Sequence, residues 1–406
     1  MTNHIEPSIV LCEPQCWGFE HAAFNAALLQ TVLSAYPEDR VVFLGEKGHV
    51  GHVREVLGQW STTDQPRVVW QEIGIPSRLL TGWRRMNAES TSCRNVLALS
   101  SVWNARAVIM CSMTETGLLA LKARLCGSSE RVPILVVLHS VLRTLEQRLP
   151  RRPWNWIVHL RQVLKLPHSR QLSYVALGGS IQAALNESAP RAARHFQVLD
   201  PPYFMAERSA STNGPPILRF GYFGTAIDDV KGFRQFVEVA EEASHAGGGV
   251  ANEFVMVGFL NRRGDPVSMN DQVVKGLSYT ALPYVEYTQR AREVTYAVSI
   301  ADPRHYRLVA SASFLDALCY VKPGIYLRNP FIEYYFDRMG DIGYLCSSYG
   351  EVRDNVLSIV ARFPVDRYER QCQNILIGRR LFQPQMLAPR LRAIVTQTRS
   401  TAVGKG

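Results

Sequence analysis

Short apolar runs that end on a turn residue recur along this chain, and they constrain its fold more than any other feature. The first run is Ser8–Pro14 (SIVLCEP), a helical pattern follows over Glu20–Leu33, and the second run is Val41–Gly48 (VVFLGEKG). An unbroken apolar run of this length is typical of a strand that is buried on both faces. Strands that alternate with helices predict a parallel sheet covered by helices on both sides.

The alternation is interrupted near residue 210. The segment Pro201–Pro216 is rich in Pro, Ser, Ala, Gly and Asn, which is typical of a linker, and a new strand-like run follows it at Ile217–Gly224. We therefore expect an α/β protein with two Rossmann-like, doubly wound parallel-sheet domains facing a cleft. The expected domains cover 1–205 and 206–385, with a C-terminal helix or tail over 386–406. Ligands are expected at the carboxyl ends of the strands.

Composition narrows the class of protein. The chain has 406 residues, 47% of them apolar, which is ordinary for a globular protein. It lacks an apolar run long enough to span a membrane and a basic start followed by an apolar run, so we expect neither a membrane-spanning helix nor a secretory signal. The eight cysteines are scattered without a zinc-binding spacing. They predict reduced thiols in a cytoplasmic protein that holds no metal.

The net charge of +10 indicates an anionic partner. Basic and apolar residues are interleaved in two stretches, Ser77–Arg85 (SRLLTGWRR) and Arg143–Arg170, and the second carries seven Lys or Arg and one Glu. Trp beside Arg suits a phospholipid surface, so we expect a peripheral membrane surface as a partner. A solvated helix with an ordinary buried face is the simpler alternative. No nucleic-acid motif accompanies the charge, so we expect no nucleic-acid partner.

The turn Gly224–Gly232 (GTAIDDVKG) is the first candidate binding element. A strand is expected to end at Gly224, and a polar loop with Thr225 leads to Lys231 at the start of a helix. Free backbone N–H groups and a helix N-terminus beside a cation suit a phosphate. Many such turns bind nothing, so this turn by itself leaves both interpretations open.

The stretch Ser311–Gly324 (SASFLDALCYVKPG) is the second candidate. Ser313 and Asp316 are three residues apart, as in a capping box, and that spacing needs no ligand. Alternatively, Ser311 and Ser313 offer hydroxyls and helix amides to a phosphate, and Asp316 accepts hydrogen bonds from the two hydroxyls of a ribose. This stretch alone favours the capping interpretation.

The order of these stretches resembles the C-terminal domain of GT-B glycosyltransferases, in particular the large retaining family of bacterial polysaccharide and lipid-linked sugar transferases. The resemblance covers roughly residues 217–361 and is carried by Gly224–Gly232, by Leu282–Val294 (LPYVEYTQRAREV) and by Ser311–Gly324 with its closing Lys-Pro. Leu308 stands where that family has its first acid.

The resemblance implies a site for a nucleotide-diphosphate sugar, which is the donor substrate, and no separate cofactor. It implies that Asp316 holds the ribose and that Lys231 meets the diphosphate. It also implies that the loop with Tyr284 and Val285 lies near the base.

The first domain is expected to bind the acceptor. Its first strand leads to a loop with aromatic residues around Gly18, followed by Glu20 and His21 at a helix start. Either residue is a candidate general base, although Glu20 also suits the helix dipole and His21 an exposed first turn. His139 closes the strand-like run Val132–Ser140 and is a third catalytic candidate, with a structural hydrogen bond as the alternative.

A series of glycines, Gly45, Gly48 and Gly51, follows the second strand-like run. It invites a dinucleotide-binding interpretation, but the spacing does not match that fingerprint.

Taken together, these features predict a cytoplasmic, membrane-associated glycosyltransferase of the hexosyltransferase type. It would move a sugar from a nucleotide-diphosphate sugar to a saccharide or lipid-linked saccharide, in bacterial surface polysaccharide or glycolipid synthesis. Two alternatives stay open: a sugar-nucleotide epimerase on the same fold, and a catalytically inactive nucleotide-sugar-binding scaffold.

Overall fold

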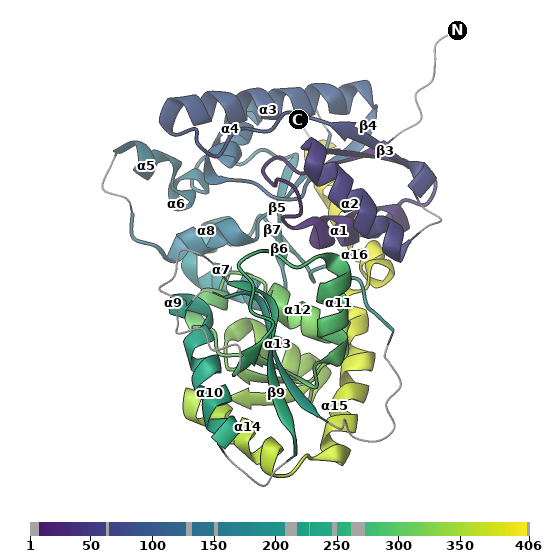
Figure 1. Cartoon of the computed structure of the whole chain (residues 1–406). Helices are drawn as coiled ribbons and strands as arrows, with labels where there is room; N and C mark the ends of the chain where they lie inside the picture. The colour runs from purple at the N-terminus through teal and green to yellow at the C-terminus, as the bar shows by residue number, and fades with distance from the viewer. Residues whose placement is uncertain are drawn as a thin grey trace. The chain divides into compact units, whose positions relative to one another are not determined.

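The computed structural model describes residues 8–61, 65–126, 132–149, 153–207, 217–226, 228–245, 250–260 and 273–403. The chain divides into two compact units, each built on a parallel sheet (Figure 1). The first contains Met1–Phe204, Leu308–Ala310 and Leu381–Gly406, and the second contains Met205–Arg307 and Ser311–Arg380. The residues expected to form a separate C-terminal tail, 386–406, thus belong with the first unit.

The sheet of the first unit has seven parallel strands in the order β3-β2-β1-β4-β5-β6-β7. Their bounds are β1 (Ser8–Cys12), β2 (Arg40–Gly45), β3 (Val68–Glu72), β4 (Ala105–Met110), β5 (Ile134–Val137), β6 (Leu172–Leu177) and β7 (Phe196–Leu199). Strands β1 and β5 are buried along their whole length, as expected of a sheet covered on both faces. The strand order reverses between β1 and β4, which makes the loops after these two strands a topological switch point.

Helices cover both faces of this sheet, because right-handed crossovers that run in opposite directions from β1 lie on opposite sides. They are α1 (Ala22–Ala35), α2 (Lys47–Trp60), α3 (Gly82–Val102), α4 (Glu115–Leu125), α5 (Pro153–Val158), α6 (Leu160–Val163), α7 (Gly179–Ser188), α8 (Pro190–Ala193) and α16 (Pro384–Val403), with short 3-10 helices η1 (Gln65–Arg67) and η2 (Ser140–Glu146). Helix α16 packs against α1 and against β5 and β7, so the last helix completes the core of the first unit.

The sheet of the second unit has six parallel strands in the order β10-β9-β8-β11-β12-β13. Their bounds are β8 (Leu218–Ala226), β9 (Asn252–Leu260), β10 (Val274–Lys275), β11 (Tyr296–Ser299), β12 (Gly324–Leu327) and β13 (Gly343–Cys346). The order reverses between β8 and β11, so the switch point of this unit lies at the carboxyl ends of those two strands. Strand β8 pairs with β9 as far as Ala226, two residues beyond the expected end at Gly224.

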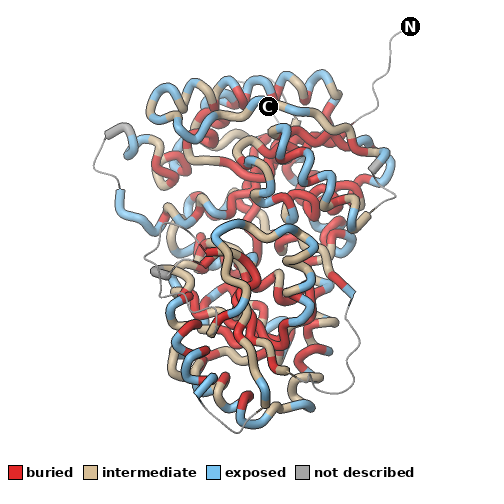
Figure 2. The backbone as a smooth tube through the Cα atoms, in the orientation of Figure 1, coloured by how far each residue is buried: buried red, intermediate tan, exposed pale blue. Residues whose placement is uncertain are grey.

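The second unit has helices α9 (Asp228–Lys231), α10 (Phe233–His245), α11 (Tyr284–Glu293), α12 (Ala312–Cys319), α13 (Pro330–Met339), α14 (Tyr349–Ala361) and α15 (Val365–Gly378), and 3-10 helix η3 (Pro303–Tyr306). A further 3-10 turn, η4 (Arg379–Phe382), leads from α15 to α16. Helices α10 and α14 pack together over one face of the sheet, where Phe220, Phe236 and Phe254 form an aromatic core. Figure 2 shows the buried residues gathered in the interior of each unit, with exposed residues around them.

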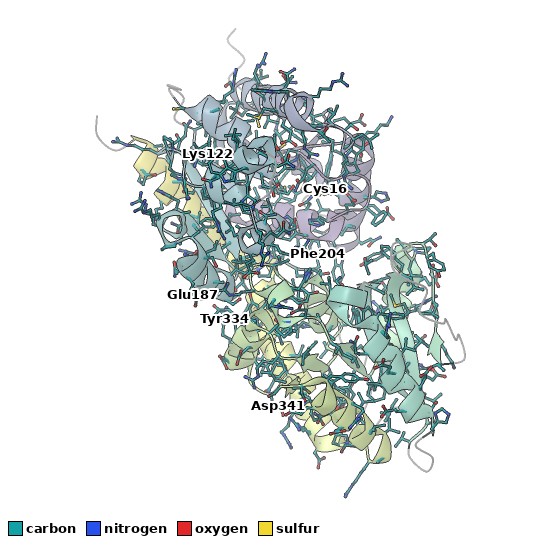
Figure 3. All side chains as sticks on the ribbon, turned by 90° about the vertical axis from the view of Figure 1, so that its left-hand side faces the viewer. Cys16, Lys122, Glu187, Phe204, Tyr334 and Asp341 are labelled. Atoms are coloured by element: carbon teal, nitrogen blue, oxygen red, sulfur yellow. The ribbon has the colours of Figure 1, made fainter. Side chains whose placement is uncertain are left out.

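All eight cysteines are free thiols, and seven of them are buried. Cys16, labelled in Figure 3, is 4% exposed. Burial raises the pKa of Cys93 and of Cys319 to about 12, so these groups stay protonated and unreactive near neutral pH. These seven thiols are thus part of the core, and Cys126 is exposed.

Candidate functional site

Three of the predicted binding residues meet at the switch point of the second unit. Gly224 lies near the carboxyl end of β8 with φ +88°, a conformation that glycine adopts easily. A Cβ atom at Gly224 would lie 3.8 Å from Nζ of Lys231 and 4.0 Å from Cβ of Ser313. The backbone of Gly224, the ammonium group of Lys231 and the first turn of α12 are therefore close together. Thr225 follows as a half-buried strand residue.

The turn that carries Lys231 is fixed against the end of β11. Gly232 has φ +66°, and a Cβ atom there would lie 2.3 Å from the carbonyl oxygen of Ile300, so the turn requires glycine. The backbone N–H of Asp302 donates to the carbonyl of Val230 at 2.9 Å. Among the residues that the structure describes, no group accepts a hydrogen bond from the Lys231 ammonium. The turn therefore offers a positive charge to an anion.

The capping of α12 differs from the expected capping box. Ser311 is the N-cap: its Oγ accepts a hydrogen bond from the N–H of Phe314 at 3.3 Å and lies 3.1 Å from Oγ of Ser313. The box on Ser313 and Asp316 is therefore wrong, because the helix begins earlier and Asp316 lies in its second turn. Ser313 and Asp316 are three residues apart in α12, so their side chains lie on the same face of this helix.

Tyr320 is the C-cap of α12, and its N–H donates to the carbonyl of Asp316 at 3.3 Å. Burial raises the pKa of Tyr320, and the negative charges of Cys319, Tyr284 and Asp316 would act in the same direction. The hydroxyl of Tyr320 is 3.3 Å from Oγ1 of Thr288, which follows Tyr284 by one turn of α11. The helices that carry the predicted ribose residue and the predicted base-side residue are thus in contact through these two hydroxyls, and neither Tyr320 nor Thr288 was identified from the sequence. Tyr284 and Val285 are the first two residues of α11 and not part of a loop as expected, and Val285 is 77% exposed.

A buried carboxylate lies at the switch point of the first unit. Glu13 directly follows β1 and is fully buried. Its oxygens accept hydrogen bonds from the N–H groups of Gln15 (3.0 Å) and Cys16 (3.2 Å), from Nδ2 of Asn25 (3.0 Å) and from the hydroxyl of Ser112 after β4. These bonds satisfy the carboxylate and fix the start of the loop. Glu13 was missed in the sequence, although an acid directly after a buried strand is a usable signal.

Glu20 is held in an ion pair. Nη1 of Arg78 donates to its Oε1 at 2.8 Å, and the N–H of Trp17 donates to its Oε2 at 3.2 Å. Burial acts to raise the pKa of Glu20, but these hydrogen bonds and the charge of Arg78 outweigh it and lower the pKa below its usual value. Glu20 is therefore a weak base.

The other two catalytic candidates are neighbours. The ring centroids of His21 and His139 lie 4.7 Å apart. Burial, reinforced by the charge of His21, lowers the pKa of His139 to about 3, so this residue is neutral near pH 7. Its Nε2 has no hydrogen-bond partner among the described residues. Desolvation also lowers the pKa of His21, against the carboxylates of Glu13 and Glu20, which act to raise it.

The stretch Ser77–Arg85 presents two large apolar side chains to solvent. Leu79 is 91% exposed and Trp83 is 75% exposed, although Arg78 and Arg85 pair with carboxylates. In the second basic stretch, Trp156 and Ile157 are also exposed. No helix among the described residues is long and apolar enough to cross a bilayer.

No family model and no curated protein matches the sequence. Solved structures do. A glycosyltransferase from Rickettsia africae ESF-5 is 9% identical with a TM-score of 0.62, over 97% of this chain and 98% of that one. Anabaena HepE in complex with UDP-glucose is 11% identical with a TM-score of 0.61, over 96% and 99%. WaaG, a glycosyltransferase involved in lipopolysaccharide biosynthesis, is 11% identical with a TM-score of 0.60, over 96% and 99%. These structures have the GT-B fold.

The chain has the GT-B fold. The predicted fold class and the resemblance to GT-B proteins are thereby confirmed. Within this GT-B protein, the described contacts bring together Gly224, Lys231 and Ser313 in the second unit, and His21 and His139 in the first.

Proposed function

We propose that the protein is a glycosyltransferase that moves a sugar, of the hexose type, from a nucleotide-diphosphate sugar to a saccharide acceptor. The observation that carries the proposal is the approach of Lys231 Nζ and Ser313 Cβ to the Cβ position of Gly224, 3.8 and 4.0 Å away. A cation, hydroxyls and helix amides at a switch point suit a diphosphate. The structure of HepE, which has the same fold, contains UDP-glucose.

The reaction is a displacement at the anomeric carbon. The bond from this carbon to the phosphate oxygen breaks, a bond to the acceptor oxygen forms, and the acceptor hydroxyl loses its proton. The ammonium of Lys231 and the N-terminus of α12 would stabilise the charge that develops on the leaving diphosphate. Asp316 would accept hydrogen bonds from the ribose hydroxyls, with Tyr284 and Val285 near the base. With these groups in place, the reaction would need the donor and the acceptor and no separate cofactor.

We assign the acceptor proton to His21 rather than to Glu20 or His139. Glu20 is bound by Arg78 and has a lowered pKa, and the pKa of the buried His139 is about 3, so both are weak bases. His21 has solvent access, and although desolvation lowers its pKa, the carboxylates of Glu13 and Glu20 act against that shift. The Glu13 carboxylate would stabilise the imidazolium that forms when His21 accepts a proton. Its neighbour His139 would orient the ring.

We also propose that the acceptor is lipid-linked and that the protein works at the cytoplasmic face of a bacterial membrane, in surface polysaccharide or glycolipid synthesis. The exposed Leu79 and Trp83 between arginines support this, because such side chains suit an anionic lipid surface. WaaG, with a similar fold, is involved in lipopolysaccharide biosynthesis.

Calorimetric titration with UDP, GDP, ADP, CDP and dTDP tests the donor half of the proposal. We expect at least one to bind, with affinity about tenfold or more weaker in Lys231→Ala, since one charge-assisted contact contributes roughly 1.5–3 kcal/mol. Lys275→Ala is the matched control, because Lys275 pairs with Glu253 at the edge strand β10. Binding of none of the nucleotides would contradict the proposal.

Leu308 at the position of the missing acid favours one alternative, an inactive nucleotide-sugar-binding scaffold. That alternative gives nucleotide binding without turnover. An epimerase would instead release a free epimerised sugar nucleotide without any acceptor.

A further inference from the structure

The glycine series does not fit a dinucleotide site. Gly45 ends β2, and Gly48 and Gly51 lie in the first turns of α2, whose start contacts the loop after β1. Glu46 is the N-cap of α2, and its Oε2 accepts a hydrogen bond from the N–H of His49 at 2.9 Å. The same oxygen accepts one from the N–H of Gly18 at 3.5 Å. One carboxylate therefore holds both the helix start and a residue 28 positions earlier.

His49 holds the other side of the same residue. Its Nδ1 lies 2.8 Å from the carbonyl oxygen of Gly18, and a carbonyl can only accept, so Nδ1 carries the hydrogen. Nε2 is then the acceptor for Nδ2 of Asn25 at 2.8 Å, and the same Nδ2 donates to Oε2 of Glu13 at 3.0 Å. Glu13, Asn25 and His49 are all fully buried. The series of hydrogen bonds from the Glu13 carboxylate through Asn25 and His49 to the Gly18 carbonyl thus has one consistent set of donors and acceptors.

The glycines leave room for these side chains. A Cβ atom at Gly48 would lie 3.1 Å from Oε2 of Glu46, closer than nearly all real contacts. A Cβ atom at Gly45 would lie 3.3 Å from Cγ2 of Val50 and 3.6 Å from Cδ2 of His49. Side-chain packing therefore accounts for Gly45 and Gly48 without a bound nucleotide, whereas a Cβ atom at Gly51 would meet nothing within 4 Å.

The loop that they hold contains two residues in the left-handed conformation, Gly18 and His21, each with φ 54°. For His21 this conformation is unfavourable, and such a residue needs support from its surroundings. The loop presents Phe19, which is 60% exposed, and Trp17, which is 39% exposed. Exposed aromatic rings on a loop of fixed shape suit the apolar face of a sugar ring.

We propose that Glu46, His49 and Asn25 are positioning residues that clamp the backbone N–H and carbonyl of Gly18, and that the clamped loop 17–21 binds the saccharide acceptor. The inference rests on the proposed function for its ligand, but the clamp itself can be measured without any substrate.

Hydrogen exchange of peptides covering 15–24 tests the clamp. His49→Asn keeps an amide N–H near the position of Nδ1, whereas His49→Gln places its amide near Nε2 and loses the bond to Gly18. We expect exchange about tenfold or more faster in His49→Gln and near the wild-type rate in His49→Asn. Glu46→Ser is the second variant, since serine also caps a helix but is too short to reach Gly18, and it should accelerate exchange as well. Equal rates in all four proteins would overturn the clamp.

Capture on an array of immobilised oligosaccharides tests the ligand. Wild type should bind at least one saccharide, and Trp17→Ala, Phe19→Ala and His49→Gln should each weaken binding, while His49→Asn should retain it. Unchanged binding in His49→Gln despite faster exchange, or no capture by wild type, would overturn the assignment of the loop. Titration of the same variants with the nucleotide panel separates the outcomes: nucleotide binding should be unaffected by these changes, and its absence in wild type would instead count against the proposed function.

Discussion

The hydroxyls of Ser311 and Ser313 lie 3.1 Å apart, yet only Ser311 caps α12. Ser311→Ala should therefore lower the free energy of unfolding by about 1 kcal/mol, the usual effect of losing a cap. Ser313→Ala should leave stability nearly unchanged and weaken binding of the nucleotide diphosphate several-fold. Urea unfolding and calorimetric titration of both variants measure the two effects. If Ser313→Ala destabilised the protein as much as Ser311→Ala, Ser313 would have a structural role instead.

Gly224→Ala should abolish detectable nucleotide binding, because the added carbon would fill the space beside Lys231 and Ser313. The left-handed conformation should also cost about 1–2 kcal/mol of stability. Gly340→Ala is the matched control: its φ is +79°, but the nearest atom to its Cβ position is Nδ2 of Asn374, 3.6 Å away on α15. Both variants should lose stability in urea unfolding, because each glycine has a positive φ, and only Gly224→Ala should lose binding. Equal nucleotide affinity in Gly224→Ala and Gly340→Ala would contradict the placement of the nucleotide beside Gly224.

Asp316→Asn should weaken UDP more than 2′-deoxy-UDP, or the corresponding pair for whichever base binds best. A carboxylate accepts from both ribose hydroxyls, and a charged hydrogen bond contributes roughly 1.5–3 kcal/mol. Wild type should therefore prefer the ribose form about tenfold, and the variant should show little preference. Asp337→Asn, at an exposed position of α13, should behave as wild type. If Asp316→Asn kept the wild-type preference for the ribose form, Asp316 would not bind the ribose.

Leu79→Ser with Trp83→Ser should reduce sedimentation with phosphatidylglycerol-rich vesicles by about tenfold or more, because burial of each side chain contributes roughly 1.5–3 kcal/mol. Vesicles of phosphatidylcholine alone should bind less of the wild-type protein, since they lack the charge that attracts arginine. Ile377→Ser with Met386→Ser removes two other exposed apolar residues and should have no effect. Wild-type protein that stays in the supernatant with both lipids would refute membrane association.

His168 should make stability depend on pH in the acid range. Its ring stacks on His195 with centroids 3.7 Å apart, and burial, followed by the charge of His195, lowers its pKa to about 4. Between pH 6.5 and about 4, the unfolded chain binds a proton at His168 that the folded chain does not bind, so stability falls as the pH falls. The loss should reach roughly 2–3 kcal/mol. His168→Phe keeps a ring but cannot titrate, so urea unfolding at several pH values should show a shallower slope. His52→Gln, at an exposed site, should keep the wild-type slope.

Much of the fold follows from local patterns. The unbroken apolar runs of β1 and β5 are buried strands because helices cover both faces of the sheet. The restart of the pattern at Ile217 lies just before β8. The predicted end of β8 was less accurate. Thr225 and Ala226 pair with β9 and extend the strand, and a short stretch of sequence does not reveal pairing with a neighbouring strand.

Some residues of the candidate site could likewise be predicted from the sequence, and others could not. Lys231 and Ser313 could be found because both follow strands that end at the switch point. The cap at Ser311 could not be chosen over Ser313 from spacing, since either hydroxyl can reach an N–H three residues later. Glu13, Asn25 and His49 are far apart in the sequence and are joined only by folding, so no local pattern reveals their network.

Helix α16 has a consequence for how the protein can be made. Its apolar residues Leu391, Ile394 and Val395 are buried in the first unit, whose last strand, β7, ends at Leu199, far earlier in the chain. During synthesis on the ribosome, the second unit emerges before the first has its last helix, and the bare side of α1 stays uncovered until then. Any shortened version meant to fold alone therefore needs the segment from Leu381 onward joined back to the first unit.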